Sequence, residues 1–135
     1  MYTQIMTVKD EHIDFQGIMD GLYYPFYMEE CRHKFLKDEV GIDIEEYAKN
    51  GLNLVLVEYS LKFKSSLHKG DKVEVSCNLI PEECSRIKFV VEQKISCNGK
   101  IAAEAKFTAT AVKAAGGRPF VPQELNEYLT RLIEA

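Results

Sequence analysis

The sequence of 135 residues lacks the features that mark several large classes of protein. No segment approaches the ~18 consecutive apolar residues of a membrane-spanning helix. The segment from Met1 to Lys9 has neither a charged region followed by an apolar run nor a small-residue cleavage site. The 17 basic and 21 acidic residues of the chain are scattered, and the formal charge is −4. The sequence therefore has no basic stripe of the kind that binds nucleic acid. We therefore expect a cytoplasmic protein without a membrane or nucleic-acid partner.

The cysteines and histidines show no metal-binding or disulfide pattern. The 4 cysteines contain no C-x-x-C pair, and in a reducing compartment buried thiols are the simplest interpretation. Cys31, on an apolar helical face, is expected in the core. His33 and His68 have no ligand-like spacing, so neither a metal nor a cofactor is expected. The length and the 46% apolar content fit one domain over residues 1–135.

Alternating apolar and polar residues predict a series of strands. From Asn53 onward the apolar residues recur at every second position, which is typical of a half-buried strand. The inward-facing residues expected in these four segments are Val55, Val57, Tyr59, Leu61 and Phe63; Val73, Val75, Cys77 and Leu79; Ile87, Phe89 and Val91; and Ala103, Ala105, Phe107 and Ala109. Such a series predicts an antiparallel sheet with one covered face. The segment Tyr2 to Lys9 alternates more weakly and is a candidate fifth strand at one edge.

Turn-forming residues separate these strands. Asn98-Gly99 best tolerates the positive φ angles of a type I′ turn and predicts a hairpin between the last two strands. Gly70-Asp71 and Pro81-Glu82-Glu83 mark the other turns.

Three segments have helical patterns. A long helix is expected from about Tyr24 to Val40, stopped by Gly41. The pair Asp43 and Glu46 resembles a capping box and predicts a short helix that ends by Gly51. A last helix follows Pro122. The apolar stripes of the long and last helices are Tyr24, Met28, Cys31 and Phe35, and Leu125, Tyr128, Leu129 and Leu132.

A carboxylate, two glycines and a helix start come together between His12 and Pro25. The start of a helix has unpaired N–H groups and a partial positive charge, which can polarise a carbonyl or hold an oxyanion. Gly21 has no Cβ and lets a substrate carbonyl approach this backbone closely. Asp14 lies upstream, where a carboxylate can attack that carbonyl or activate a water. The stretch is therefore a candidate thioester-hydrolase site.

The same residues also have a purely structural interpretation. An Asp in a turn before a helix most often bonds to local N–H groups as an Asx turn or a cap, and Asp14 taken alone favours this role. Asp20 is a good candidate for the helix cap itself. The glycines can be ordinary loop residues.

A chain-long resemblance favours the catalytic interpretation. The run from Asp14 to Tyr24, followed by Tyr27, Glu29-Glu30 and Arg32, resembles the signature of the 4-hydroxybenzoyl-CoA thioesterase family. That signature is an Asp, two residues, a Gly, a hydrophobic pair and a polar pair, then an aromatic residue and Glu-x-x-Arg along the helix. The segments Tyr59 to Asp71 and Gly117-Arg118-Pro119, with Pro122, resemble the second strand with its turn and the C-terminal exit of that family.

The resemblance implies a fold and an assembly. The implied fold is the α+β hot-dog fold, an antiparallel sheet of about five strands wrapped around one long central helix, with a C-terminal helix. Members of the family form homodimers in which two long helices lie under a continuous sheet and each site is completed by the partner, and dimers of dimers are common.

The resemblance also implies an activity, the hydrolysis of an acyl-CoA thioester. Asp14 falls on the catalytic Asp and Gly21 on the residue whose N–H polarises the carbonyl. Three positions depart from the pattern: His12 replaces a usual acidic residue, Asp20-Gly21 replaces a pair with Asn or His, and Ser65-Ser66 replaces prolines. His12 and Asp20 are therefore candidates to assist Asp14.

Several further residues are candidates for substrate binding. Gln16 and Gly17 belong to the signature, and Tyr24 is a candidate for the acyl pocket together with Phe15, Tyr23, Phe26 and Tyr27. The phosphates of coenzyme A need cationic or N–H partners, for which the candidates are Lys62, Lys64, Lys88, Ser85 and Arg86. Ser85-Arg86 is the preferred pair, although each cation can equally belong to a solvated sheet face.

Three rival functions remain open. One is a non-catalytic hot-dog module that binds an acyl chain or acyl carrier protein, and another is hydrolysis of acyl carrier protein thioesters. The third is a hot-dog dehydratase, which His12 does not favour because it lacks the expected turn and helical Glu. The acyl group is not specified by the sequence.

Overall fold

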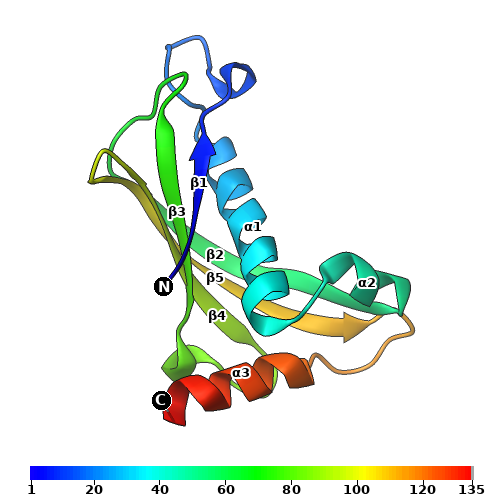
Figure 1. Cartoon of the computed structure of the whole chain (residues 1–135). Coiled ribbons are helices and arrows are strands. Elements are labelled where there is room, and N and C mark those ends of the chain that lie inside the picture. The colour runs from blue at the N-terminus through cyan, green and yellow to red at the C-terminus, as the bar shows by residue number, and fades with distance from the viewer. Residues whose placement is uncertain (135) are drawn as a thin grey trace.

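The computed structural model describes residues 1–134 and contains one antiparallel sheet with helices. The elements are β1 (Tyr2–Thr7), η1 (Asp10–His12), α1 (Tyr23–Phe35), η2 (Leu36–Val40), α2 (Ile44–Lys49), β2 (Leu52–Phe63), β3 (Lys72–Leu79), η3 (Pro81–Glu83), β4 (Phe89–Cys97), β5 (Lys100–Lys113) and α3 (Gln123–Glu134). The strand order is β1-β3-β4-β5-β2, and every neighbouring pair is antiparallel. The predicted α+β hot-dog arrangement, with β1 at one edge, is confirmed (Figure 1).

The long helix forms as its apolar spacing predicts. Tyr24, Met28, Cys31 and Phe35 are all buried. The helix continues from α1 into the π-helical turn η2 and ends at Gly41, whose φ of 88° is the left-handed conformation that glycine adopts without strain. The predicted limits of this helix are therefore confirmed.

The core lies between α1 and one part of the sheet. α1 packs on β1, β3 and β4 (Figure 1), and the buried residues include Phe35, Val75, Phe89 and Ile95. The short helix α2 packs on β2. β2 itself is an edge strand, and its side chains are mostly exposed along the length of the strand.

A β-bulge in β2 overturns part of the predicted alternation. The register with β5 shifts between Leu56 and Glu58, so Val57 is an additional residue without a partner. The bulge reverses the faces on its N-terminal side. The residues opposite the inward-facing positions of β5 are therefore Leu54, Leu56, Tyr59, Leu61 and Phe63. The prediction was wrong for Val55 and Val57.

Local signals at the other turns were mostly informative. Asn98 (φ 52°) and Gly99 (φ 77°) have the two positive φ angles of the predicted hairpin. The carboxylate of Asp43 caps α2, while Glu46 pairs with Lys49 instead of completing a capping box. Ile87 was wrongly predicted to face inward.

The chain turns before β4 starts, because the Ser85 N–H donates to the Lys88 carbonyl at 2.9 Å. β4 therefore begins at Phe89, and Ile87 is 59% exposed. Within residues 1–134, no helix has the length and apolarity needed to cross a bilayer.

Candidate active site

The segment that carries Asp14 is held to the end of the sheet by backbone hydrogen bonds. The Met19 N–H donates to the Leu67 carbonyl at 2.8 Å, and the Asp20 N–H donates to the His12 carbonyl at 3.0 Å. Ile13 and Met19 form an antiparallel bridge, so the residues between them form a tight turn. The segment connects β1 to α1 and lies at one end of the molecule (Figure 1).

Asp14 forms the Asx turn that its sequence context predicts. One carboxylate oxygen accepts the Gln16 N–H at 2.8 Å, and the other accepts the Gln16 side-chain amide at 3.3 Å. Gly17 follows with a φ of 82°, a conformation that favours glycine in this turn. The carboxylate is half-buried and held in place, and its oxygens keep further lone pairs for a substrate or a water.

Gly21 presents a free N–H just before α1. Among the hydrogen bonds of residues 1–134, the Gly21 N–H donates none. Gly21 borders a cavity of about 360 Å³ together with Tyr24, Phe63 and Lys64. A Cβ at Gly21 would lie 3.4 Å from the Phe63 ring, so the glycine leaves space between backbone and ring. A carbonyl oxygen of suitable shape can approach this N–H.

Asp20 is not the N-terminal cap of α1. Its carboxylate accepts the Leu22 N–H at 2.9 Å, whereas Leu22 is the cap residue and has no side-chain cap bond. Asp20 thus forms a second Asx turn one step before the helix, because Gly21 and Leu22 extend the turn before helical hydrogen bonding begins. Within residues 1–134, no hydrogen bond joins Asp20 to Asp14.

His12 is buried and connects the Asp14 segment to α1. Its Nδ1 lies 2.6 Å from the Tyr27 hydroxyl, which also accepts the Lys9 N–H at 3.1 Å. A hydroxyl that accepts the Lys9 N–H can also give its own proton to Nδ1, and the direction of this bond depends on the His12 tautomer. The imidazole ring stacks on Tyr23 with centroids 4.0 Å apart. His12 therefore anchors the segment, and among residues 1–134 it has no hydrogen bond to the Asp14 side chain.

Tyr24 and Lys64 are the predicted binding residues that lie beside Gly21. Tyr24 is 3% exposed and packs edge-on against Phe63, and burial raises its pKa above the ordinary value. Lys64 borders the cavity and lies 3.3 Å from the Glu104 carboxylate. Asp14 does not line this cavity within the single chain.

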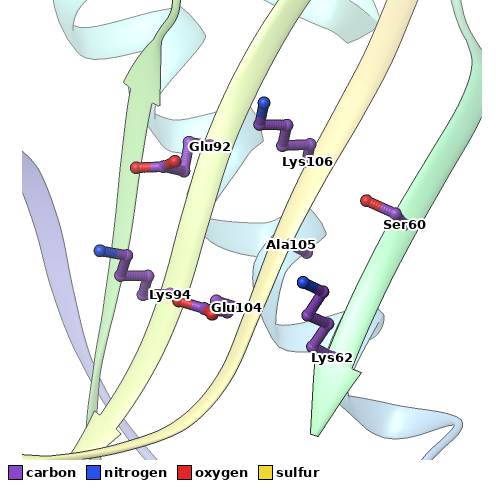
Figure 2. A pocket seen from close by; sticks show the side chains of 7 residues that line it. All are labelled: Ser60, Lys62, Glu92, Lys94, Glu104, Ala105 and Lys106. Atoms are coloured by element: carbon purple, nitrogen blue, oxygen red, sulfur yellow. The ribbon is translucent and has the colours of Figure 1, made fainter.

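The other predicted cations lie elsewhere. Lys62 lines a shallow hollow of about 370 Å³ on the sheet with residues of β4 and β5, and Figure 2 shows Ser60, Glu92, Lys94, Glu104 and Lys106 around it. Positive and negative side chains alternate in this hollow, so it has the character of a solvated sheet face.

Ser85 and Arg86 are not brought to Gly21 by their own chain. They follow β3, whereas the Asp14 segment is bonded to the residues that precede β3. A strand of 8 residues is about 27 Å long. Ser85 and Arg86 are exposed, as is Lys88, and the Ser85 hydroxyl accepts the Ile87 N–H at 3.2 Å.

Two contributors to this region were not assigned a role from sequence. Phe63 was expected only as an inward-facing strand residue, yet its ring closes one side of the Gly21 cavity. Tyr27 was grouped with the aromatic residues, and its hydroxyl fixes His12. Neither role has a local signal, because each depends on contacts between segments distant in sequence. Residues 1–134 contain no group of three or more His, Cys, Asp or Glu side chains placed to hold a metal.

The chain matches a known protein family over most of its length. The model of a family described as the thioesterase-like superfamily matches residues 8–129. An acyl-acyl carrier protein thioesterase of Arabidopsis thaliana chloroplasts is 33% identical over 84 residues, which are 62% of this chain and 44% of that protein. This chain thus spans under half the length of that relative.

Solved structures share the fold over almost the entire chain. A hypothetical protein of Aquifex aeolicus is 29% identical with a TM-score of 0.86, covering 96% of this chain and 99% of the other. A gentisyl-coenzyme A thioesterase is 23% identical with a TM-score of 0.84, covering 94% and 98%.

Proposed function

The chain belongs to the thioesterase-like superfamily, and from this membership we propose that it hydrolyses an acyl thioester of coenzyme A to the free acid and the thiol. The observation that carries the proposal is the Gly21 N–H just before α1, which has no hydrogen bond within residues 1–134 and lies beside a cavity of about 360 Å³. A donor at this position stabilises the negative charge that develops on a thioester oxygen. The partial positive charge of the helix start adds to this effect.

Asp14 supplies the carboxylate of the reaction. In one route its oxygen attacks the carbonyl carbon, the C–S bond breaks, and water then hydrolyses the resulting anhydride. In the other route the carboxylate takes a proton from water, whose oxygen forms the new bond to carbon as the C–S bond breaks. In both routes the leaving thiolate acquires a proton. Gln16 holds the carboxylate in one orientation for either role.

A second copy of the chain completes the site in this proposal. Within residues 1–134, β2 pairs only with β5, so this strand of 12 residues has one open edge. Its exposed apolar side chains include Val57 at 59% and Phe63 at 57%. Such an edge is suited to pairing with its own copy about a two-fold axis. Antiparallel pairing brings the start of the partner's β2 beside the end of this strand, where Phe63 meets Gly21. It also turns the partner's Ser85-Arg86 loop toward the end that carries Asp14.

Lys64 is the cation best placed for the phosphates of coenzyme A, because it borders the Gly21 cavity and is half exposed. The partner's Ser85 and Arg86 are the further candidates. Gly17 and Gln16 shape the turn beside the reacting carbonyl, and Tyr24 forms part of the acyl pocket.

The acyl donor has one supported alternative. The Arabidopsis relative is named as a thioesterase for acyl-acyl carrier protein, and the gentisyl-coenzyme A enzyme shares the fold. Both donors present the same thioester through a phosphopantetheine arm. Rates on carrier-linked and CoA-linked forms of one acyl group distinguish the two.

The test is the release of free thiol from a panel of aliphatic and aromatic acyl-CoAs. We expect turnover by the native protein, a loss of about 10³-fold for Asp14→Asn, and near-native rates for Asp10→Asn. Asp10 is a matched control, because it is an exposed acid on the same segment that pairs with Lys69 at 3.3 Å. Binding of acyl-CoA by calorimetry without any thiol release would replace catalysis with the non-catalytic binding module.

The two roles of Asp14 differ in a single turnover in ¹⁸O-labelled water. A nucleophilic Asp14 whose anhydride is hydrolysed at the Asp14 carbonyl places the label first in its own carboxylate and leaves the first acid unlabelled. A general base places the label directly in the acid.

A further inference from the structure

Arg32 is a buried cation on α1 that the proposed chemistry does not use. It is 4% exposed, and its guanidinium lies over the Phe107 ring at 4.4 Å from the centroid. Burial is the main reason that its pKa is lowered from the ordinary value. A guanidinium stays charged even so, because its ordinary pKa is far above neutral. The interior therefore holds a permanent positive charge.

The orientation of the guanidinium is fixed by a buried amide. Arg32 donates to the Gln93 side-chain oxygen at 3.0 Å. Gln93 is 0% exposed, and its amide nitrogen donates to the carbonyls of Met28 at 2.9 Å and Ser76 at 3.3 Å. These two bonds leave only the amide oxygen to face Arg32. The arrangement is rigid and uses one edge of the guanidinium.

Arg32 has no carboxylate partner within residues 1–134. No ion pair joins it to an acidic residue, and its hydrogen bond to Gln93 is to a neutral group. Glu29, one turn earlier, is half exposed and lies 3.6 Å from His33 instead. A buried charge without a counter-ion costs several kcal/mol. Of the five N–H donors of a guanidinium, most remain available to a ligand.

Arg32 also borders a cavity. A space of about 310 Å³ is lined by Arg32 and, among others, the apolar side chains of Leu36, Ile44, Leu54 and Phe89. The volume is at the lower end of the range for small-molecule sites. Glu29 and His33 also line this cavity, where they lie 3.6 Å from each other. A buried cation beside an apolar wall favours a ligand that is apolar along its length and anionic at one end.

The cavity lies along the same part of the sheet as Gly21. The Gly21 cavity is bounded by Phe63, which pairs with Ala103, whereas Arg32 covers Phe107. Phe107 lies four residues after Ala103, about 13 Å farther along β5. The inward-facing residues beside Phe107 are the small Ala105 and Ala109.

We propose that Arg32 binds a carboxylate at the far end of the acyl group, so that the chain prefers thioesters of dicarboxylic acids. This inference rests on the proposed thioesterase function and names its substrate class. The thioester carbonyl lies at Gly21, the methylene chain follows the small residues of β5, and the terminal carboxylate pairs with the guanidinium. Glu29 opposes the anion only weakly, because its charge is half exposed and screened by water.

The test compares pairs of CoA thioesters that differ only in the end group: adipoyl with hexanoyl, suberoyl with octanoyl, and sebacoyl with decanoyl. We expect the native kcat/KM to favour the carboxylated member by about tenfold or more for the chain length that reaches Arg32. Arg32→Met should reduce that ratio to about one. Lys34→Met removes an exposed cation from the same helix and should leave the ratio unchanged.

A second comparison uses the native protein alone. The ω-methyl ester of suberoyl-CoA keeps the length and oxygen atoms but removes the charge, and it should lose the preference. Equal rates on carboxylated and methyl-ended substrates at every length would overturn the inference while leaving thioesterase activity intact. An equal fall on both substrates in Arg32→Met would also overturn it and assign Arg32 to packing or to a partner's carboxylate. If no thioester is hydrolysed, the proposed function fails, and calorimetric binding of the same pairs still tests Arg32.

Discussion

β4 and β2 belong to one sheet but differ in how the chain uses them. β4 lies between β3 and β5 under α1, and most of its side chains are buried. β2 lies at the edge and exposes Val55, Leu56, Val57, Tyr59 and Phe63 by 39–59%. The free energy of folding therefore comes mainly from the β3–β4 side. The apolar surface of β2 is left available, and the Gly21 and Arg32 cavities both border this strand.

The largest effect should come from a matched pair of phenylalanines. Phe35 is 2% exposed and packs in the core between α1 and the sheet. Phe35→Ala should therefore lower the free energy of unfolding by about 3–5 kcal/mol. Phe63 is 57% exposed, and Phe63→Ala should lower the free energy of unfolding by less than about 1 kcal/mol. Denaturant unfolding at one fixed protein concentration measures both. Equal losses of stability would show that the edge strand β2 contributes as much to folding as the core under α1.

A charge on the edge strand tests what the exposed surface is for. Val57 is unpaired in the bulge and 59% exposed, so Val57→Glu should barely change the stability of a single chain. In a dimer paired through β2 it would bury two like charges and weaken association by about 2–4 kcal/mol. Sedimentation should show the mass of one chain for Val57→Glu and of two for the native protein. A variant that stays dimeric would exclude β2 as the interface.

A smaller loss of stability is expected where the segment that carries Asp14 is attached to α1. Tyr27→Phe removes the hydroxyl that bonds to His12 and Lys9, and should cost about 1–2 kcal/mol of stability. It should also lower turnover, because the segment that carries Asp14 loses its attachment to α1. Thermal unfolding and kcat measured on the same sample separate the two effects. Unchanged turnover would show that the attachment is not needed for catalysis.

The smallest effect should come from the cap of α2. Asp43 accepts the N–H groups of Glu45 and Glu46, and Asp43→Ala should cost about 1 kcal/mol. Glu45→Ala, which leaves the cap intact, is the control. Equal losses in the two variants would mean that the cap adds little to the packing of α2 on β2.

The sequence was most informative where a structure depends on neighbouring residues. Asn98-Gly99 needs only its own φ angles to form the hairpin, and Asp43 needs only the next N–H groups. The apolar spacing of α1 also predicted its buried face. The bulge at Val57 was not predicted, because it depends on the register between β2 and β5 and leaves no mark in the alternation.

The candidate site was only partly accessible from sequence. The Asx turn at Asp14 and the approach to Gly21 follow from local residue types. The burial of Arg32 against Gln93, and the bond between His12 and Tyr27, required the packing of distant segments. The separation of Ser85-Arg86 from Gly21 likewise follows from the direction of β3, which local patterns do not contain.

The most direct test of the account is thiol release from an acyl-CoA by the native protein, Asp14→Asn and Asp10→Asn under identical conditions. We predict turnover by the native protein and by Asp10→Asn, and a loss of about 10³-fold for Asp14→Asn with unchanged thermal unfolding. Full activity in a folded Asp14→Asn protein would contradict the account, because the reaction would then not depend on the carboxylate of the segment that precedes α1.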